Sequence, residues 1–211
     1  MRIAMNKDDL LKNIAETGYN VGFGAKKSFS TFDIVDKAPG IISFASMAFG
    51  IYALALDGLS TKFLSATFII FGVIGLYISL YDNRKHEYEK AGVALTKLFN
   101  ELGRLYRTTK NADESQIPAL KESLEKLENQ SFEISISKQI LFSDWYAHYK
   151  FFWQHQIDWV EDQKQFKFWR DKIPLTLTLT ITLIIILLAY FIASLSFPDL
   201  AFCLSGALSN A

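Results

Sequence analysis

Cysteine, dense basic blocks and catalytic motifs are all scarce in this chain, and each scarcity excludes a class of protein. The 211 residues include a single cysteine, Cys203, so an internal disulfide is excluded. The simplest interpretation of Cys203 is a small apolar residue, and a reactive or intersubunit thiol is the alternative. Basic and acidic residues both number 22, and no Lys/Arg block is present. The charge therefore does not suggest sequence-independent binding to nucleic acid.

Signatures of catalysis and ligand binding are missing as well. Residues 22–27 contain glycines and lysines, but they lack the spacing of a phosphate-binding loop and no strand of apolar residues precedes them. We expect these glycines to mark a break between two short helices. His148 and His155 lie two helical turns apart, too far to bind one metal ion without other ligands. Without a nucleophile–base pair or a metal cluster, we expect no enzyme activity, no cofactor and no metal.

Charge is absent from three long segments, which dominate the interpretation. Residues 41–56, 63–81 and 175–197 contain no Asp, Glu, Lys, Arg or His. A membrane-spanning helix needs about 20 mainly apolar residues, and hydrocarbon requires its backbone to be bonded internally. The first two segments are joined by a short polar turn, so they predict an antiparallel hairpin. A buried helical pair in a soluble bundle is the alternative, but soluble core helices rarely lack charge for so long.

The third segment follows Pro174 and begins with alternating leucine and threonine, as a strand would. Its length favours a helix, and proline suits a first helical turn. The predicted fold is an all-α integral membrane protein, with a transmembrane hairpin, a third span and a cytosolic helical bundle between spans two and three. The predicted parts are cytosolic N-terminal helices at 1–37, the hairpin at 38–81, the cytosolic helical region at 82–173, the third span at 174–197 and an external tail at 198–211.

The distribution of Lys and Arg predicts the orientation. Six precede the first span, one lies in the hairpin turn, fifteen lie between spans two and three, and none follows span three. Basic residues stay on the cytoplasmic side, so the N-terminus is expected inside and the C-terminus outside a plasma (inner) membrane. Residues 1–37 have no apolar core, so we expect no secretory signal and a retained first span.

Small and hydroxylated residues in the spans predict where helices pack and what could line a pore. Small side chains four residues apart let helices approach closely in lipid, within the hairpin or between subunits. The predicted packing residues are Ser46, Gly50, Gly75 and Ser79. The candidate pore-lining residues of the third span are Thr176, Thr178, Thr180 and Thr182, and those of the hairpin are Ser43, Ser46, Ser65 and Thr67. The absence of ionisable residues argues against a coupled transporter or pump.

Heptad-like patterns predict packed helices between spans two and three. Apolar residues at 88, 91, 95, 98, 102 and 105 form a seam, and a shorter helix is expected from Ile117 to about Asn129. Aromatic residues also follow a heptad over 134–172, which predicts a helix that is apolar on more than one face. This helix could pack in the bundle, bind a partner or lie in the headgroup layer at 166–172. The candidate partner-binding aromatics are Trp145, Tyr149, Phe152 and Trp159.

One family shares this arrangement. The segments 19–27, 32–42 and 76–82, together with the helix over 88–106 that contains Leu98-Phe99-Asn100-Glu101-Leu102, resemble the SLATT family of two-transmembrane effectors from prokaryotic conflict systems. The resemblance covers roughly residues 10–110 and rests on the order of helices, since the family has no catalytic signature to transfer. The third span departs from the two-span pattern and is similar to a longer branch associated with retron reverse transcriptases.

The resemblance implies an antiviral effector that oligomerises and perforates or disrupts the inner membrane when a sensor releases it, which causes abortive infection. The sensor it implies is a reverse transcriptase with its RNA–DNA hybrid, or a cyclic-oligonucleotide system. The expected partners are therefore the lipid bilayer, further copies of the chain and a sensor complex. A non-catalytic membrane scaffold or accessory subunit is the alternative, since it would share the same topology.

Overall fold

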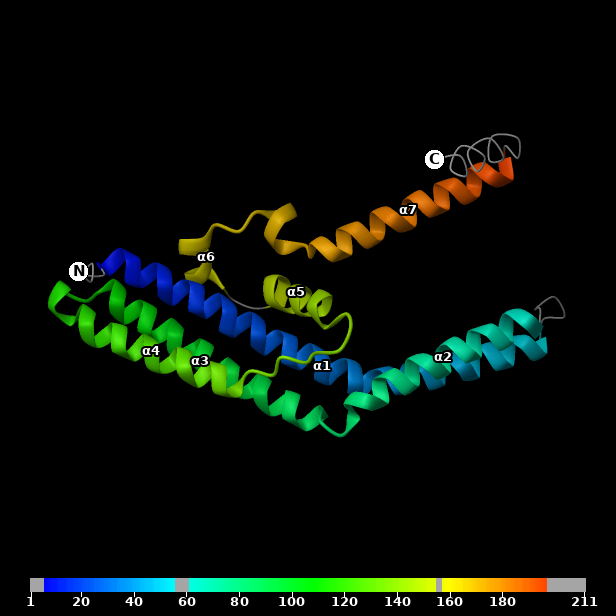
Figure 1. Cartoon of the computed structure of the whole chain (residues 1–211), viewed down its shortest axis with the longest axis horizontal. Helices are drawn as coiled ribbons and strands as arrows, with labels where there is room; N and C mark the ends of the chain where they lie inside the picture. Colours follow the sequence, from blue (N-terminus) through cyan, green and yellow to red (C-terminus); the bar gives the residue numbers. More distant parts are fainter. Residues whose placement is uncertain (1–5, 56–60, 155–156, 197–211) are drawn as a thin grey trace, which may run out of the picture. The chain divides into compact units, whose positions relative to one another are not determined.

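The computed structural model describes residues 6–55, 61–154 and 157–196, except the side chains of residues 61, 169 and 193–196, and is built from helices (Figure 1). Most of the hairpin turn, and the whole tail at 198–211, lie outside the described residues. No strand occurs in the described ranges. The elements are α1 (Lys7–Ala55), α2 (Thr61–Asp82), α3 (Lys85–Lys110), η1 (Glu114–Gln116), α4 (Ile117–Ile134), α5 (Ser143–Gln154), α6 (Asp158–Lys164), η2 (Phe168–Lys172) and α7 (Leu175–Ser196).

The first helix is continuous over 49 residues, from the N-terminal region into the first apolar segment. The predicted break near Gly22 is therefore wrong. A Cβ placed on Gly22 would lie 2.7 Å from Phe99 Cδ2 and 2.9 Å from Phe151 Cε2, so this glycine gives two aromatic rings room against α1. Pro39 also lies inside the helix, where it removes one backbone hydrogen bond without ending α1.

Helices α3, α4, α5 and α6 pack with residues 7–38 of α1 to form a bundle. The largest contact joins α1 to α3, and every residue of the predicted α3 seam is buried. This confirms that the spacing of 3 and 4 residues identified the packed face of α3. Side chains that are fully or almost fully buried in the common core are Leu10, Ile14, Leu95, Leu102, Phe151 and Val160.

The prediction of one helix over residues 134–172 is wrong. The chain leaves helical conformation after Ile134, forms α5, α6 and η2 as short separate elements, and runs without helix between α4 and α5. Two residues adopt left-handed backbone conformations, Phe142 with φ 68° and Gln165 with φ 44°, and neither can continue an α-helix. The heptad spacing of the aromatic residues therefore did not come from one helix. These residues belong to several short elements, and most of their rings pack against the bundle.

Of the described residues, 167–196 belong to a second compact unit. Within it, Arg170 Nε lies 2.9 Å from Asp171 Oδ1, and the Lys167 backbone N–H donates to Asp171 Oδ2 at 2.8 Å. These contacts stabilise the η2 turn directly before α7. The start of α7 at Leu175, immediately after Pro174, agrees with the predicted helix start.

Candidate functional site

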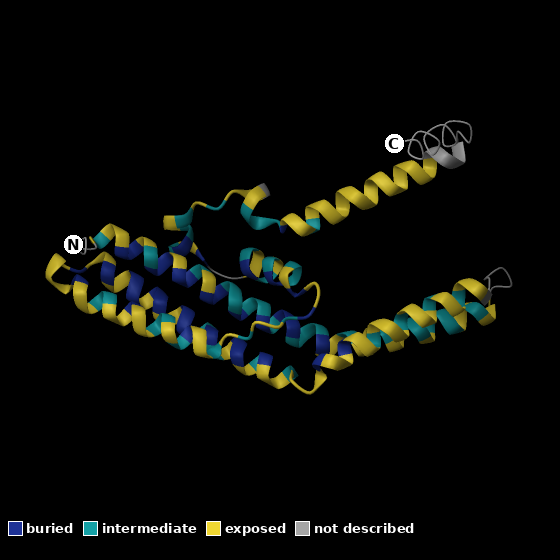
Figure 2. Cartoon of the chain, in the orientation of Figure 1, coloured by how far each residue is buried: buried dark blue, intermediate teal, exposed yellow. Residues whose placement is uncertain are grey.

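Among the described residues, three helices are long and apolar enough to cross a membrane: the α1 helix with its apolar C-terminal part, α2 and α7. Most residues of these apolar segments are half-exposed or exposed (Figure 2), and Leu54, at 90% exposure, is the extreme case. Exposed apolar surface of this extent is costly in water and is expected of helices that face lipid. We name residues 39–55 of α1 together with α2 the hairpin.

The two helices of the hairpin meet along one face of α2. The members of this face recur every three or four residues and are less exposed than their neighbours: Leu64, Thr67, Phe71, Gly75 and Ile78. On α1, the ring of Phe49 lies 6.2 Å from the ring of Phe71. The hairpin therefore packs through aromatic and aliphatic contact, as the antiparallel pairing of two apolar segments predicts.

The predicted packing residues occupy different environments. Ser46, Gly50 and Gly75 are half-buried, whereas Ser79 is exposed and its hydroxyl donates to the Leu76 carbonyl at 2.7 Å. A Cβ placed on Gly50 or Gly75 would meet no atom within 4 Å. Neither glycine is needed for a close approach within one chain, so their role in packing between chains stays a prediction.

The four threonines of α7 divide into two pairs. Helical geometry of about 100° per residue places Thr176 beside Thr180 and Thr178 beside Thr182, on nearly opposite sides of the helix. Thr180 donates to the Thr176 carbonyl at 2.8 Å, and Thr182 donates to the Thr178 carbonyl at 2.9 Å. A single pore axis would meet only one of the two pairs. Two hydroxyls of the hairpin likewise donate to the backbone carbonyl four residues earlier in the same helix. Ser43 donates to the Pro39 carbonyl and Thr67 to the Phe63 carbonyl, each at 2.9 Å.

A separate apolar cluster joins the hairpin to the bundle. Its buried members come from four segments of the chain: Val35, Ile78, Tyr81, Tyr88 and Ile140. Val35 precedes the apolar part of α1, Ile78 and Tyr81 end α2, and Tyr88 begins α3. We call this cluster the junction. It fixes both hairpin helices to the bundle at the point where they leave it.

The non-helical segment between α4 and α5, residues 135–142, crosses the junction, and we call it the strap. Tyrosine hydroxyls hold its backbone: Tyr88 donates to the Lys138 carbonyl at 2.6 Å, and Tyr81 donates to the Gln139 carbonyl at 3.3 Å. The Leu141 backbone N–H donates to the Tyr77 hydroxyl at 3.1 Å. These bonds replace the helical hydrogen bonds that the strap lacks, which explains how an extended segment can lie here.

Ion pairs surround the junction on the bundle side. Lys85 Nζ lies 3.2 Å from Asp36 Oδ1, which links α3 to α1. Asp33 pairs with Lys150 of α5 and, at 2.7 Å, with Lys37. Burial acts to raise the pKa of Asp33, but the hydrogen bonds and charges of Lys150 and Lys37 outweigh it and lower that pKa. The carboxylate therefore stays charged and ties α5 to α1 near the junction.

The predicted partner-binding aromatics do not share one surface. Trp159 lies against Gly18 of α1, and its ring centroid is 5.2 Å from that of Phe99, while Phe152 contacts Phe166 at 5.1 Å. Both belong to the bundle core or its edge. Tyr149 is exposed, and Trp145 is half-buried. The stripe was divided because Ile157 lies outside helical conformation, so that α5 and α6 are separate helices.

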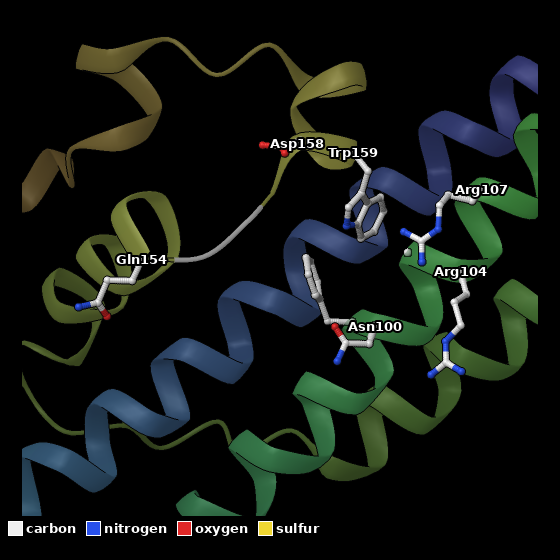
Figure 3. Close-up of a pocket in the computed structure, with 8 residues that line it drawn as sticks. Asn100, Arg104, Arg107, Gln154, Asp158 and Trp159 are labelled. Carbon is white, nitrogen blue, oxygen red and sulfur yellow. The ribbon is translucent and has the colours of Figure 1, made fainter.

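A cavity of about 740 Å³ lies beside Trp159, between α3 and the end of α5. Asn100, Arg104 and Arg107 contribute from α3, and Figure 3 shows Arg107 reaching toward Trp159. The residues that line it include Arg104, Arg107 and Asp158, and the guanidinium of Arg107 suits an acidic ligand. Within the described ranges, no group of three or more His, Cys, Asp or Glu is placed to hold a metal ion. His155 and Cys203 lie outside those ranges.

Sequence reasoning missed the strap and the tyrosines that hold it. The alternation Ile134-Ser135-Ile136-Ser137 was a signal, because a period of two residues is typical of extended chain and interrupts the heptad. The spacing of Tyr77, Tyr81 and Tyr88 gave no such signal, since the three lie on two helices and converge only in three dimensions.

One known family matches most of the chain. Residues 5–181 match the family described as SMODS and SLOG-associating 2TM effector domain 6. The matched range contains the hairpin, the whole bundle and the first turns of α7. No curated protein and no solved structure gives a significant match to the chain.

Proposed function

Because the chain belongs to the SLATT family of two-transmembrane effector domains, we propose that it is the effector of a bacterial antiphage defence system and makes the membrane leaky when a sensor releases it. The observation that best supports this proposal is the unbroken helix α1, which belongs to both the bundle and the hairpin. A helix of this length transmits a displacement of its bundle end directly to the span. A change sensed by the bundle can thus rearrange the hairpin.

The junction would act as the lock of the inactive state. It joins α1, α2, α3 and the strap through one apolar cluster and the tyrosine bonds to the strap backbone. Both hairpin helices are held at one end while these contacts persist. Release of the strap from the tyrosines would free α2 to change its pairing with α1. The helix surfaces around Gly50 and Gly75, which have open space beside them, could then pack against the hairpin of another copy of the chain.

The leak itself would be formed by an oligomer without ionisable residues in its spans. Hydroxyl groups and backbone carbonyls are then the polar groups available to the permeating ions. On α7, either Thr176 with Thr180 or Thr178 with Thr182 would face the pore. This mechanism needs no catalytic step, and abortive infection would follow from loss of the ion gradients.

We place the protein in the plasma (inner) membrane with its N-terminus and bundle in the cytoplasm. The fifteen Lys and Arg residues between α2 and α7 support this orientation. It also puts the bundle where an intracellular sensor could reach it. A reporter enzyme fused after Ala211 should be active outside the cytoplasm, and a cytoplasmic reporter would contradict the orientation.

We propose that the sensor docks at the cavity beside Trp159. Candidate sensors are a reverse transcriptase with its RNA–DNA hybrid, as in a retron, or a cyclic-oligonucleotide system. The cavity is formed where α3 and the α5–α6 region approach, and its arginines could pair with acidic groups of such a partner. The double variant R104E/R107E should reduce recovery of the partner proteins at least tenfold. The control K121E/K126E reverses two charges on α4 and should retain the partners; equal recovery by both variants would contradict docking here.

The leak is tested by dye uptake in cells that express the chain alone or with its neighbouring genes. We expect a membrane-impermeant dye to enter cells when the chain is expressed alone or triggered, and to stay outside when the neighbours hold it inactive. A membrane scaffold is the alternative. It predicts no dye uptake in any condition, and G50L would then change recovery of partners without changing viability.

A further inference from the structure

The strap ends, directly before α5, in a loop of two exposed apolar residues next to the hairpin. Leu141 is 60% exposed and Phe142 is 53% exposed. The Leu141 N–H is bonded to the hydroxyl of Tyr77, a residue within the apolar run of α2. Figure 1 accordingly shows this loop at the hairpin end of the bundle. The loop tip thus lies at the level where α2 becomes apolar.

The backbone at Phe142 indicates that its side chain has a use beyond forming a turn. Its φ of 68° lies in the left-handed region, which favours glycine or asparagine and is unfavourable for a bulky residue. A turn alone would be formed better by glycine. Phe142 contacts Trp145, with ring centroids 4.7 Å apart, yet remains more than half exposed. Packing within the chain therefore does not account for a phenylalanine at this position.

The surroundings of the loop have the chemistry of a membrane surface. The exposed Lys138 places its amine 5.4 Å from the ring centroid of Tyr81, and Arg84 is exposed just after α2 ends. Leu80, one turn from Tyr77 on α2, is 71% exposed. Aromatic and basic residues collect in this way at the boundary between headgroups and hydrocarbon.

We propose that Leu141 and Phe142 insert into the headgroup layer of the bilayer that the hairpin crosses, so that the start of α5 is anchored to lipid. The Tyr77–Leu141 bond holds the exposed end of the strap against α2, whose apolar residues face lipid. Two apolar residues are also too few for the core of a stable protein–protein interface. The strap is then held by tyrosines on one side and by lipid on the other.

The test measures how strongly a nitroxide on the lipid quenches a fluorophore attached to the full-length chain. The chain is reconstituted into phosphatidylethanolamine–phosphatidylglycerol vesicles. In a C203S background, an environment-sensitive fluorophore is attached to a single cysteine introduced by L141C. Some of the phospholipid carries a nitroxide near the headgroup end of its acyl chain. We expect this lipid to quench the label several-fold more strongly than it quenches a label at S115C. Ser115 lies in η1, between α3 and α4, and Figure 1 shows the connection of these two helices at the end of the bundle away from the hairpin.

A label at L76C, on the exposed face of α2, reports separately whether the hairpin has inserted. The inference depends on that insertion and not on the leak, so the two can fail independently. If L76C is quenched by the nitroxide lipid and L141C is quenched no more than S115C, the inference is overturned. If L141C is protected both from the lipid nitroxide and from iodide in the water, the loop is covered by protein, and the inference is equally overturned.

The variant F142G separates lipid contact from folding. Glycine removes the unfavourable left-handed phenylalanine, so we expect the chain to remain folded and its thermal midpoint to be unchanged or higher. Quenching of the L141C label by the nitroxide lipid should nevertheless fall at least twofold in F142G. Unchanged quenching would contradict a role for the Phe142 ring in the headgroup layer.

Discussion

At the scale of single residues, the bundle depends on glycines that let aromatic rings lie against helices. Trp159 lies against both Gly18 and Gly103, and Phe29 lies against Gly92. A sequence shows such glycines but does not show which ring faces each one. This is why Gly22 suggested a helix break, although its function is to accept Phe99 and Phe151.

Two glycines on the same helix provide a matched test. Gly22→Ala should destabilise the protein by about 1–3 kcal/mol, because a Cβ would overlap two core rings. Gly24→Ala should be neutral or stabilise by up to about 1 kcal/mol, because alanine favours helix and the nearest atom, Leu95 Cδ1, lies 3.7 Å away. Thermal unfolding in detergent measures both variants. Equal midpoints would contradict the packing described for Gly22.

The half-buried position of His148 predicts that the docking of α5 depends on pH. Its ring contacts Phe23 at 4.8 Å, and burial lowers its pKa, although the Asp144 carbonyl and charge act in the opposite direction. The folded state therefore favours the neutral ring. Its contribution to stability is complete above the unfolded pKa of about 6.5 and declines as the pH falls below that value.

We expect His148→Phe to reduce the loss of thermal stability between about pH 7.5 and pH 5.5, since phenylalanine keeps the ring contact and cannot be protonated. His86→Phe is the control, because His86 is exposed on α3. Thermal midpoints of the two variants and the parent chain at both pH values measure the effect. If His148→Phe loses as much thermal stability between the two pH values as the parent chain, protonation of His148 is not the cause of that loss.

At the scale of elements, the patterns that the sequence displays over long segments were the most informative. The hairpin helices, α3 and α7 could be predicted because 20 or so residues repeat one property, lack of charge or a heptad seam. The strap could not be predicted, because its eight residues are stabilised by tyrosines from two other helices. The positions of Trp159 and Phe152 could not be predicted either. Their rings reach the core from two short helices, α6 and α5, where the heptad pattern had predicted one long helix.

The strap predicts the effect of removing one hydroxyl group. Tyr88→Phe leaves the Lys138 carbonyl without its 2.6 Å donor, which should cost about 1 kcal/mol and loosen residues 136–141. Hydrogen exchange of the strap peptide, or its cleavage by a protease, should increase several-fold. Tyr149→Phe is the control, because its ring is exposed on α5. A strap equally protected in both variants would contradict its attachment by Tyr88.

At the scale of the whole molecule, one continuous helix connects the bundle to the membrane. Residues 7–38 of α1 form contacts with α3, α5 and α6, and residues 39–55 belong to the hairpin. The composition predicted both parts, yet it gave no reason to join them, because the glycines at 22 and 24 predicted a break and residues 1–37 were assigned to separate helices before the hairpin. A rigid connection makes the bundle a suitable place to control the hairpin.

The most direct test of this account is the membrane potential of cells in which the defence system is triggered. A potential-sensitive dye should report depolarisation before growth stops when the parent chain is present. The triggered system without this chain should keep its potential. Growth arrest that depends on this chain while the potential stays unchanged would contradict a membrane-permeabilising effector.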